Sequence, residues 1–229
     1  MTSPEHPVVF GTEDLLLSLC QSVTRVLSIG TGHPINFSGM VQRISKTCLK
    51  PDIGCFVLFD GGFSGLVVIN FSAQAAMELY ETYMLNMGMD KNELASSHTA
   101  DEVSNVMGEL MNQIVGDFTG KVSRELQTHI TQNQPKMLVL NKQVMLSVDT
   151  NLDQPETRRV TFFTRRNNIF YLELAVDRTE FIKLCDFDAS EMVDPDRLIE
   201  QAAQDNQAPA PTTASSNDDR DDLLASLGM

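Results

Sequence analysis

The sequence predicts an α+β fold in two layers, with helices packed on a mostly antiparallel sheet. Three segments, 12–28, 73–87 and 101–126, carry apolar residues at helical spacing. Short segments rich in Val, Ile, Phe and Leu lie between and after them and predict strands. A helix followed by strands occurs twice along the chain, so we expect two pseudo-duplicated helix-plus-strands units.

The composition is that of a globular protein with one sizeable core, since 42% of the 229 residues are hydrophobic and 21% are charged. The net charge of −14 makes nucleic acid and anionic membrane surfaces unfavourable partners, because their phosphate groups repel an acidic protein. No apolar run reaches the roughly 20 residues that span a membrane, and the first residues lack a signal-peptide pattern. We expect a cytoplasmic protein.

The negative charge is concentrated in the last part of the chain. From Asp186 onward there are eleven acidic and two basic residues, which contribute −9 to the net charge of −14. Residues 205–217 contain mostly Pro, Ala, Thr, Ser, Asn and Gln, which cannot fill a core. We therefore expect a domain over 1–204 that ends in a short helix at 195–204, a flexible linker over 205–217, and a C-terminal amphipathic peptide over 218–229.

The cysteines and histidines predict no metal site of the protein's own. Cys20, Cys48, Cys55 and Cys185 lack the close spacing of metal ligands, and the four histidines stand apart from one another in the sequence. Three of the cysteines have apolar neighbours. We interpret the cysteines as small buried hydrophobic side chains in a reducing compartment.

Two strong strand candidates, 54–59 and 65–71, follow the first helix, for which Thr12 is the expected N-cap residue. The residues between them, 60–64, contain two adjacent glycines and could form either a phosphate-cradling loop or a hairpin turn. We favour the hairpin because a strand follows, whereas a phosphate loop needs the N-terminus of a helix. Whether segment 54–71 is a core hairpin or a sheet edge that pairs with a second copy stays open.

The remaining strand candidates are one segment before this hairpin and four after the longest helix, at 37–44, 137–140, 144–148, 160–164 and 169–176. Asn167 and Asn168 predict a turn before the last of them.

The longest helix, 101–126, carries an unusual polar stripe. On a helical wheel the apolar residues occupy one arc, and the opposite side holds four polar residues and two glycines: Glu102, Asn105, Glu109, Asn112, Gly116 and Gly120. Each glycine costs about 1 kcal/mol relative to alanine in a helix interior. The stripe has two interpretations: a surface on which another protein docks closely, or the site where a neighbouring element of the same fold packs closely.

Residues 105–116, Asn-Val-Met-Gly-Glu-Leu-Met-Asn-Gln-Ile-Val-Gly, resemble the active helix of the CheC/CheX/FliY family of chemotaxis phosphatases. The family pattern is Asp or Ser, three residues, Glu, two residues, Asn, and a Pro after twenty-two more, and Glu109, Asn112 and Pro135 match it. Asn105 stands at the first position, where this sequence departs from the pattern. The order of helices and strands over 12–176 is also similar to that family's fold.

This resemblance implies a phosphatase that accelerates hydrolysis of the aspartyl phosphate of a CheY-like receiver domain. Asn112 would position the attacking water, and Glu109 would pair with a lysine of the receiver. The resemblance implies no cofactor of the protein's own, because the receiver's magnesium would neutralise the phosphoryl charge. Asn105, Glu102 and Gly116 are expected to extend the docking surface. The first helix has no Glu-x-x-Asn, so one active site is implied, as in the CheX type.

The peptide over 218–229 has its own resemblance. Leu223, Leu224 and Leu227 share one side of a nascent helix, and four aspartates lie at its N-terminal end. The peptide resembles the C-terminal end of CheZ, an unrelated chemotaxis phosphatase that tethers CheY, except that Met229 replaces the final aromatic residue. A peptide that docks in a receiver's groove is implied, and an acidic solubilising tail is the alternative.

Two other functions stay as alternatives. The departure at Asn105 keeps open a non-catalytic module that binds a receiver domain or a flagellar switch component. A small-molecule sensor has less support, because no ligand pocket can be read from the sequence. The resemblance also leaves open whether the protein is a monomer or a homodimer.

Overall fold

The computed structural model describes residues 9–140, 142–148 and 150–182. In this part of the chain the helices are α1 (Thr12–Thr31), α2 (Ala73–Asn86), the short 3₁₀ segment η1 (Lys91–Glu93) and α3 (Asp101–Leu126). The strands are β1 (Val9–Phe10), β2 (Asn36–Arg43), β3 (Thr47–Leu49), β4 (Ile53–Gly61), β5 (Gly65–Phe71), β6 (Ile130–Gln132), β7 (Lys136–Val139), β8 (Leu146–Val148), β9 (Pro155–Phe163), β10 (Ile169–Asp177) and β11 (Phe181–Ile182).

A seven-stranded antiparallel sheet has the order β2-β9-β10-β5-β4, with β6 and β7 both pairing with β4 at the far edge. The hairpins β4–β5 and β9–β10 meet where β5 pairs with β10. Each hairpin is flanked by a strand from the other half of the chain, since β2 lies beside β9, and β6 and β7 lie beside β4. This order confirms the predicted α+β fold with pseudo-duplicated units.

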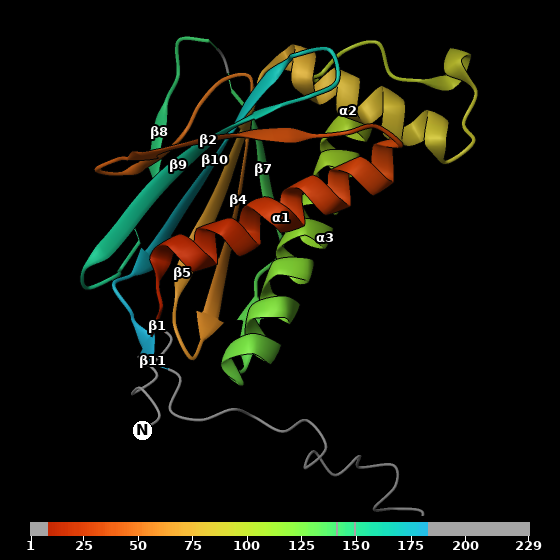
Figure 1. Ribbon diagram of the computed structural model, residues 1–229. Coiled ribbons are helices and arrows are strands. Elements are labelled where there is room, and N and C mark those ends of the chain that lie inside the picture. Colours follow the sequence, from red (N-terminus) through yellow and green to blue (C-terminus); the bar gives the residue numbers. More distant parts are fainter. Residues whose placement is uncertain (1–8, 141, 149, 183–229) are drawn as a thin grey trace, which may run out of the picture. The chain divides into compact units, whose positions relative to one another are not determined.

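The main core lies between this sheet and the helices α1 and α3, which cross on the same side of the sheet (Figure 1). The rings of Phe162, Phe170 and Phe71 are stacked in a row across three strands, with centroids 5.0 and 5.2 Å apart. Phe118 of α3 contacts Phe59 of β4 edge to face, at 5.7 Å between the centroids. The contact between Phe118 and Phe59 packs α3 against the β4 side of the sheet.

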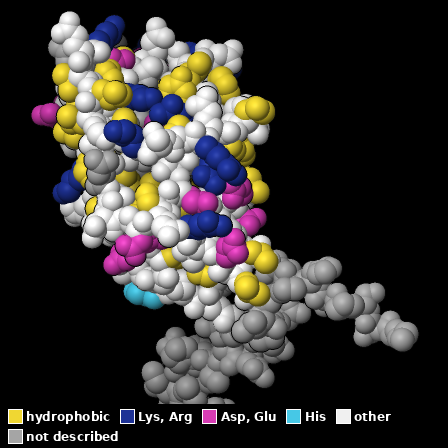
Figure 2. Space-filling model, turned by 90° about the vertical axis from the view of Figure 1, so that its left-hand side faces the viewer, with side chains coloured by type: hydrophobic (Ala, Val, Ile, Leu, Met, Phe, Trp, Pro, Cys, Tyr) yellow, Lys and Arg dark blue, Asp and Glu magenta, His cyan; other side chains and the backbone are white. Residues whose placement is uncertain are grey.

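The other face of the sheet is partly covered by the two-stranded β3–β8 ladder, where five side chains form a smaller core: Leu49, Leu66, Val68, Leu140 and Ala175. Glu173 is fully buried on this side, pairs with Arg159 at 2.7 Å, and accepts a hydrogen bond from the backbone N–H of Cys48. Figure 2 views the molecule from the side on which β8 and β9 lie in Figure 1, and charged side chains of both signs are scattered there among apolar ones.

Segment 54–71 is a core hairpin, because β4 and β5 each have a neighbouring strand on both sides. The connection between them contains Gly61 and Gly62, where the chain before β6 approaches closely. A Cβ atom on Gly61 would overlap the backbone O of His129, and one on Gly62 would overlap the side chain of Thr128. The glycines serve this close approach, and the hairpin interpretation is confirmed.

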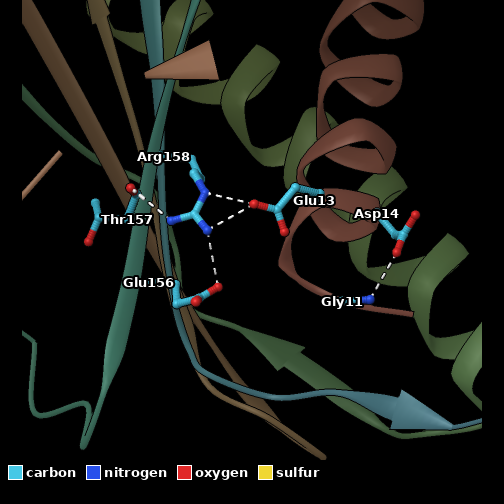
Figure 3. Close-up of polar contacts among 6 residues, drawn as sticks. All are labelled: Gly11, Glu13, Asp14, Glu156, Thr157 and Arg158. Carbon is cyan, nitrogen blue, oxygen red and sulfur yellow. Dashed lines mark hydrogen bonds and ion pairs between the residues drawn. The ribbon is translucent and has the colours of Figure 1, made fainter. Parts of the chain in front are cut away.

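Arg158 of β9 anchors the start of α1 to the sheet (Figure 3). Its side chain is 6% exposed, and its Nε and Nη2 donate to Glu13 Oε1 at 3.1 and 2.9 Å. Nη2 also donates to Glu156 Oε2 at 3.2 Å. The hydrogen bonds from Arg158 hold the pKa of Glu13 below its usual value.

The N-cap of α1 is Gly11, so the expectation that Thr12 caps the helix is wrong. The backbone N–H of Gly11 donates a hydrogen bond to Asp14 Oδ2 at 2.9 Å, so this N–H has a partner at the start of the helix (Figure 3). Thr12 is the first helical residue and is buried. Because Thr12 already belongs to the helix, the N-cap position falls on the residue before it, Gly11.

The predicted helices 73–87 and 101–126 agree with α2 and α3 to within one residue. The strand predicted at 160–164 is the end of a longer strand, β9, which begins at Pro155. Strands β1, β3, β6 and β11 were not predicted. The helix expected at 195–204, the linker over 205–217 and the peptide over 218–229 lie outside the described residues, so the proposed domain limits stay predictions.

Candidate functional site

The polar stripe lies on the solvent-exposed side of α3, and its six residues are all exposed: Glu102, Asn105, Glu109, Asn112, Gly116 and Gly120. The opposite side of the helix is buried against the sheet and α1, as Met107, Met111 and Phe118 show with at most 1% exposure. The helix therefore presents its polar residues outward on a firmly packed support.

The two glycines of the stripe are not required by packing within the fold. A Cβ atom on Gly116 would have as its nearest neighbour Gln132 Nε2, at an ordinary contact distance of 3.9 Å. A Cβ atom on Gly120 would meet nothing within 4 Å. Close packing of a neighbouring element is therefore not the explanation among the described residues, and bare helix backbone is left open to an external partner.

Asn112 is held by a residue from the neighbouring sheet edge. Gln132 of β6 donates from Nε2 to Asn112 Oδ1 at 3.0 Å, and the same nitrogen lies 3.4 Å from the backbone O of Asn112. The hydroxyl of Thr119 donates toward Gln132 Oε1 at 3.4 Å and lies 3.3 Å from the backbone O of Gly116. The Asn112 carboxamide is thus connected to β6 and, through it, to the next turns of α3.

These contacts define which way the Asn112 carboxamide faces. A backbone carbonyl only accepts hydrogen bonds, so the Gln132 atom facing it must be the nitrogen. That nitrogen donates, so the Asn112 atom facing it must be Oδ1. Nδ2 of Asn112 then points away from Gln132 and has no hydrogen-bond partner among the described residues.

Glu109 lies one turn before Asn112 on the same side of α3. Its Oε1 accepts a hydrogen bond from Gln113 Nε2 at 2.9 Å, and it has no cationic partner within residues 9–182 as described. The side chains of Glu102 and Asn105 make no hydrogen bond or ion pair with other residues in this part of the chain. An unpaired carboxylate on an exposed helix is available to a cation from another molecule.

Pro135 lies at the break between β6 and β7, two strands that run along the same neighbour, β4. Proline has no N–H to donate to a sheet, so it suits a point where the pairing is interrupted. The segment passes beside α3: Met137 of β7 lies opposite Gly108, and Gln132 of β6 lies opposite Gly116. After the end of α3 the chain therefore turns back and runs beside this helix, and Pro135 lies in the returning segment. Sequence reasoning singled out Pro135 but missed Gln132.

The remaining predictions concern the C-terminal leucines, a metal site, a membrane span and the cysteines. Leu223, Leu224 and Leu227 lie outside the described residues. Within residues 9–182, apart from 141 and 149, no group of three or more His, Cys, Asp or Glu side chains could hold a metal ion. In the same residues no helix is both long and apolar enough to cross a membrane. Cys20, Cys48 and Cys55 are free and buried.

A surface hollow of about 530 Å³ lies between the start of α1 and the end of α3, and its lining includes Leu17, Lys121 and Arg124. None of the stripe residues lines it. The arrangement at the stripe is a protruding helix face, which suits contact with another protein better than enclosure of a small molecule.

Residues 6–229 match the family model described as "Protein of unknown function (DUF3334)". The chain belongs to this family. The DUF3334 match extends beyond the described domain and includes residues 218–229. No curated protein matches the chain.

Solved structures with the same fold include chemotaxis proteins. A chemotaxis protein CheX from Desulfovibrio desulfuricans has a TM-score of 0.58 at 18% identity, over 72% of this chain and 99% of its own. A CheC-like superfamily protein from Shewanella sp. PV-4 has a TM-score of 0.59 at 16% identity, over 72% of this chain and 97% of its own. The CheX–CheY–BeF3–Mg2+ complex from Borrelia burgdorferi has a TM-score of 0.54 at 15% identity, over 72% of this chain and 99% of its match.

These similarities confirm the CheC/CheX-like fold for this DUF3334 protein. At such low identity they establish the fold alone. Function has to be argued from the stripe itself.

Proposed function

We propose that this protein is a phosphatase that accelerates hydrolysis of the aspartyl phosphate of a CheY-like receiver domain. The observation that carries the proposal is the exposed carboxamide of Asn112, held in one orientation beside the unpaired carboxylate of Glu109 on the outer face of a buried helix. Support also comes from the fold, which is shared with a CheX protein solved in complex with CheY.

The proposed reaction needs little from the protein besides orientation. A water oxygen attacks the phosphorus, the bond from phosphorus to the aspartyl oxygen breaks, and the carboxylate leaves with the electron pair. The protons of the water pass to the phosphate and the solvent. Asn112 would hold this water in line by accepting a hydrogen bond from it at Oδ1. Positioning alone supplies a large part of the acceleration when the reacting bond is already labile.

Glu109 would anchor the receiver by pairing with a lysine next to the phosphorylated aspartate. Asn105, Glu102 and Gly116 would complete the docking surface, with the bare backbone at Gly116 allowing the receiver to approach the helix closely. The magnesium ion would be supplied by the receiver, where it neutralises the phosphoryl charge. The stripe lacks a basic residue of its own, so neutralisation by the receiver's metal is needed.

The test is the decay of a phosphorylated receiver from the same cell, measured with and without the protein. We expect the protein to speed loss of phosphate, and Asn112→Ala to lose most of that acceleration while it still binds. Gln21→Ala, at an exposed position of α1 in the hollow that no stripe residue lines, is the control and should keep the activity. If the wild-type protein speeds the decay of none of the cell's receivers, the proposal is wrong.

A second function is favoured by one feature, Asn105 at the position where the CheC/CheX/FliY pattern has Asp or Ser. The same stripe could bind a receiver, or a flagellar switch component, without catalysis. Capture of a receiver on the immobilised protein, with no change in its rate of dephosphorylation, would favour this binding module. In that case Asn105→Asp is the variant that should create activity.

A further inference from the structure

We propose that Gln132 is a positioning residue that fixes the orientation of the Asn112 carboxamide, an inference that rests on the proposed phosphatase function. Gln132 does not belong to the polar stripe and lies on a different element, the short strand β6. Its side chain reaches Asn112 across the gap between the sheet edge and α3.

The geometry assigns this role to Gln132 because it contacts Asn112 at two points. Nε2 donates to the side-chain Oδ1 at 3.0 Å and faces the backbone O of the same residue at 3.4 Å. A contact to both the backbone and the side chain of one residue restricts its rotamer more than a single hydrogen bond does. Thr119, 7% exposed, faces the other end of the Gln132 amide and favours the orientation with Nε2 toward Asn112.

An exposed asparagine without such a partner would exchange among rotamers and between its two amide orientations, since oxygen and nitrogen are similar in size. With Gln132 in place, one lone pair of Oδ1 is occupied, and the second stays available to accept a hydrogen bond from water. Nδ2 faces outward and can donate to a phosphoryl oxygen. Oδ1 and Nδ2 of Asn112 would then already have the required orientation when the receiver docks, so the carboxamide need not rotate during the reaction.

The position of Gln132 follows from its neighbours in the sheet. Thr131 and Gln132 are adjacent in β6, so their side chains point to opposite sides of the strand. The Thr131 hydroxyl donates to the backbone O of Asp60 at 3.1 Å, within the sheet edge. Thr131 therefore provides a matched control, because its side chain has a hydrogen bond on the same strand and none with the stripe.

The kinetic experiment compares wild type, Gln132→Met, Gln132→Glu and Thr131→Val in the decay of the phosphorylated receiver. Met keeps the length of Gln without hydrogen bonds, and Glu replaces the donor by an acceptor that would turn Nδ2 of Asn112 inward. Both variants should lower the maximal rate roughly three- to tenfold, the factor that one modest hydrogen bond represents. The protein concentration that gives half of the maximal rate should not change, and Thr131→Val should match wild type.

A double-variant comparison separates positioning from a general effect on folding. Gln132→Met should have no further effect on the rate when Asn112 is already Ala, because the group that Gln132 orients is then absent. A loss of rate of equal size in both backgrounds, or a full maximal rate for Gln132→Glu in the wild-type background, would overturn the inference.

A second measurement does not depend on activity. The side-chain amide signals of Asn112 and Gln132 can be assigned in NMR spectra of the full chain by their loss in Asn112→Ala and Gln132→Met. The Nδ2 group of Asn112 should show restricted motion on the nanosecond scale in wild type and increased motion in Gln132→Met. Equal motion in both would overturn the inference even if the protein is a phosphatase. Restricted motion in a protein without activity would instead remove the proposed function and leave Gln132 as the residue that orients Asn112.

Discussion

At the scale of single residues, the hydrogen bonds of Arg158 have a consequence for stability that depends on pH. The pKa of Glu13 is lowered in the folded protein, mainly by the hydrogen bonds from Arg158. A carboxyl group with a lowered pKa stabilises the folded state above its unfolded pKa, and this contribution is lost as the pH falls through the folded pKa. The Glu13 side chain is 64% exposed, so solvent screens the pair and the contribution is small.

We therefore expect Glu13→Gln to lower the free energy of unfolding at neutral pH by less than about 1 kcal/mol. The difference between wild type and variant should shrink as the pH falls below 4.5, the ordinary pKa of a glutamate side chain, and disappear once Glu13 is protonated in the folded state as well. Denaturant unfolding at a series of pH values measures this. A difference that stays constant down to acid pH would show that the charge of Glu13 is not what stabilises the fold.

Two buried thiols give a second prediction at this scale. Burial raises the pKa of Cys20 to about 12, and burial also raises the pKa of Cys55. Because the thiolate is the reactive form, both should react slowly with thiol reagents in the folded protein near neutral pH and rapidly after unfolding. Fast modification of either residue in the folded protein, located by mass spectrometry, would contradict the packing described for α1 and β4.

At the scale of elements, α3 combines a firmly packed face with an outer face that weakens the helix. Gly116 and Gly120 lower helix stability, yet both positions have room for a methyl group. Gly116→Ala and Gly120→Ala should each raise the free energy of unfolding by up to about 1 kcal/mol. If the stripe is a docking surface, Gly116→Ala should at the same time weaken receiver binding.

Gly108→Ala is the matched control for this prediction. A Cβ atom there would make an ordinary contact of 3.5 Å with Met137, inside the fold and off the stripe. It should therefore stabilise the helix without weakening receiver binding. Thermal unfolding of each variant measures its stability, and a binding titration measures its affinity for the receiver. Tighter or unchanged receiver binding by Gly116→Ala would contradict the docking role of that position.

The sequence predicted an element well where residues close together along the chain stabilise it, and poorly where its partners are far away in the sequence. The boundaries of α3 were predicted because apolar residues recur along its whole length. The first part of β9 was missed because Arg158 and Arg159 suggest solvent, whereas in the structure each pairs with a distant carboxylate, Glu13 or Glu173. Such pairs leave no local pattern.

The candidate site shows the same limit. Glu109 and Asn112 lie on one helix face, so their spacing predicted that they would be exposed together. Gln132 was missed because its contact with Asn112 joins residues from two elements, and β6 is a strand of three residues without periodicity. A search for polar residues between Asn112 and Pro135 would have included it, although nothing in the sequence distinguishes it from its neighbours.

At the scale of the whole molecule, we propose that the peptide over 218–229 captures the receiver for the chemistry proposed on α3. A tethered peptide raises the local concentration of a bound receiver near the catalytic helix, to roughly the millimolar range for a short linker. Deleting 218–229 should therefore raise the protein concentration needed for half of the maximal rate by a factor of about ten or more, while the maximal rate stays the same. A control deletion of residues 1–5 should change neither quantity.

The same deletion tests the alternative that these residues only keep the protein soluble. In that case the deletion would change the tendency to aggregate but not the concentration dependence of the reaction. Replacing Leu223, Leu224 and Leu227 by Ala retains the acidic residues and removes only the apolar side. A loss of apparent affinity with these substitutions supports capture of a receiver, and an unchanged affinity contradicts it.

The most direct test of the central claim is the rate at which a phosphorylated CheY-like receiver loses its phosphate, measured at saturating concentrations of wild-type protein and of Asn112→Ala. We predict that wild type raises the rate well above spontaneous decay, and that Asn112→Ala returns it close to the spontaneous value while receiver binding is retained. An Asn112→Ala protein that binds the receiver and dephosphorylates it as fast as wild type would contradict the assignment of this helix as the active site.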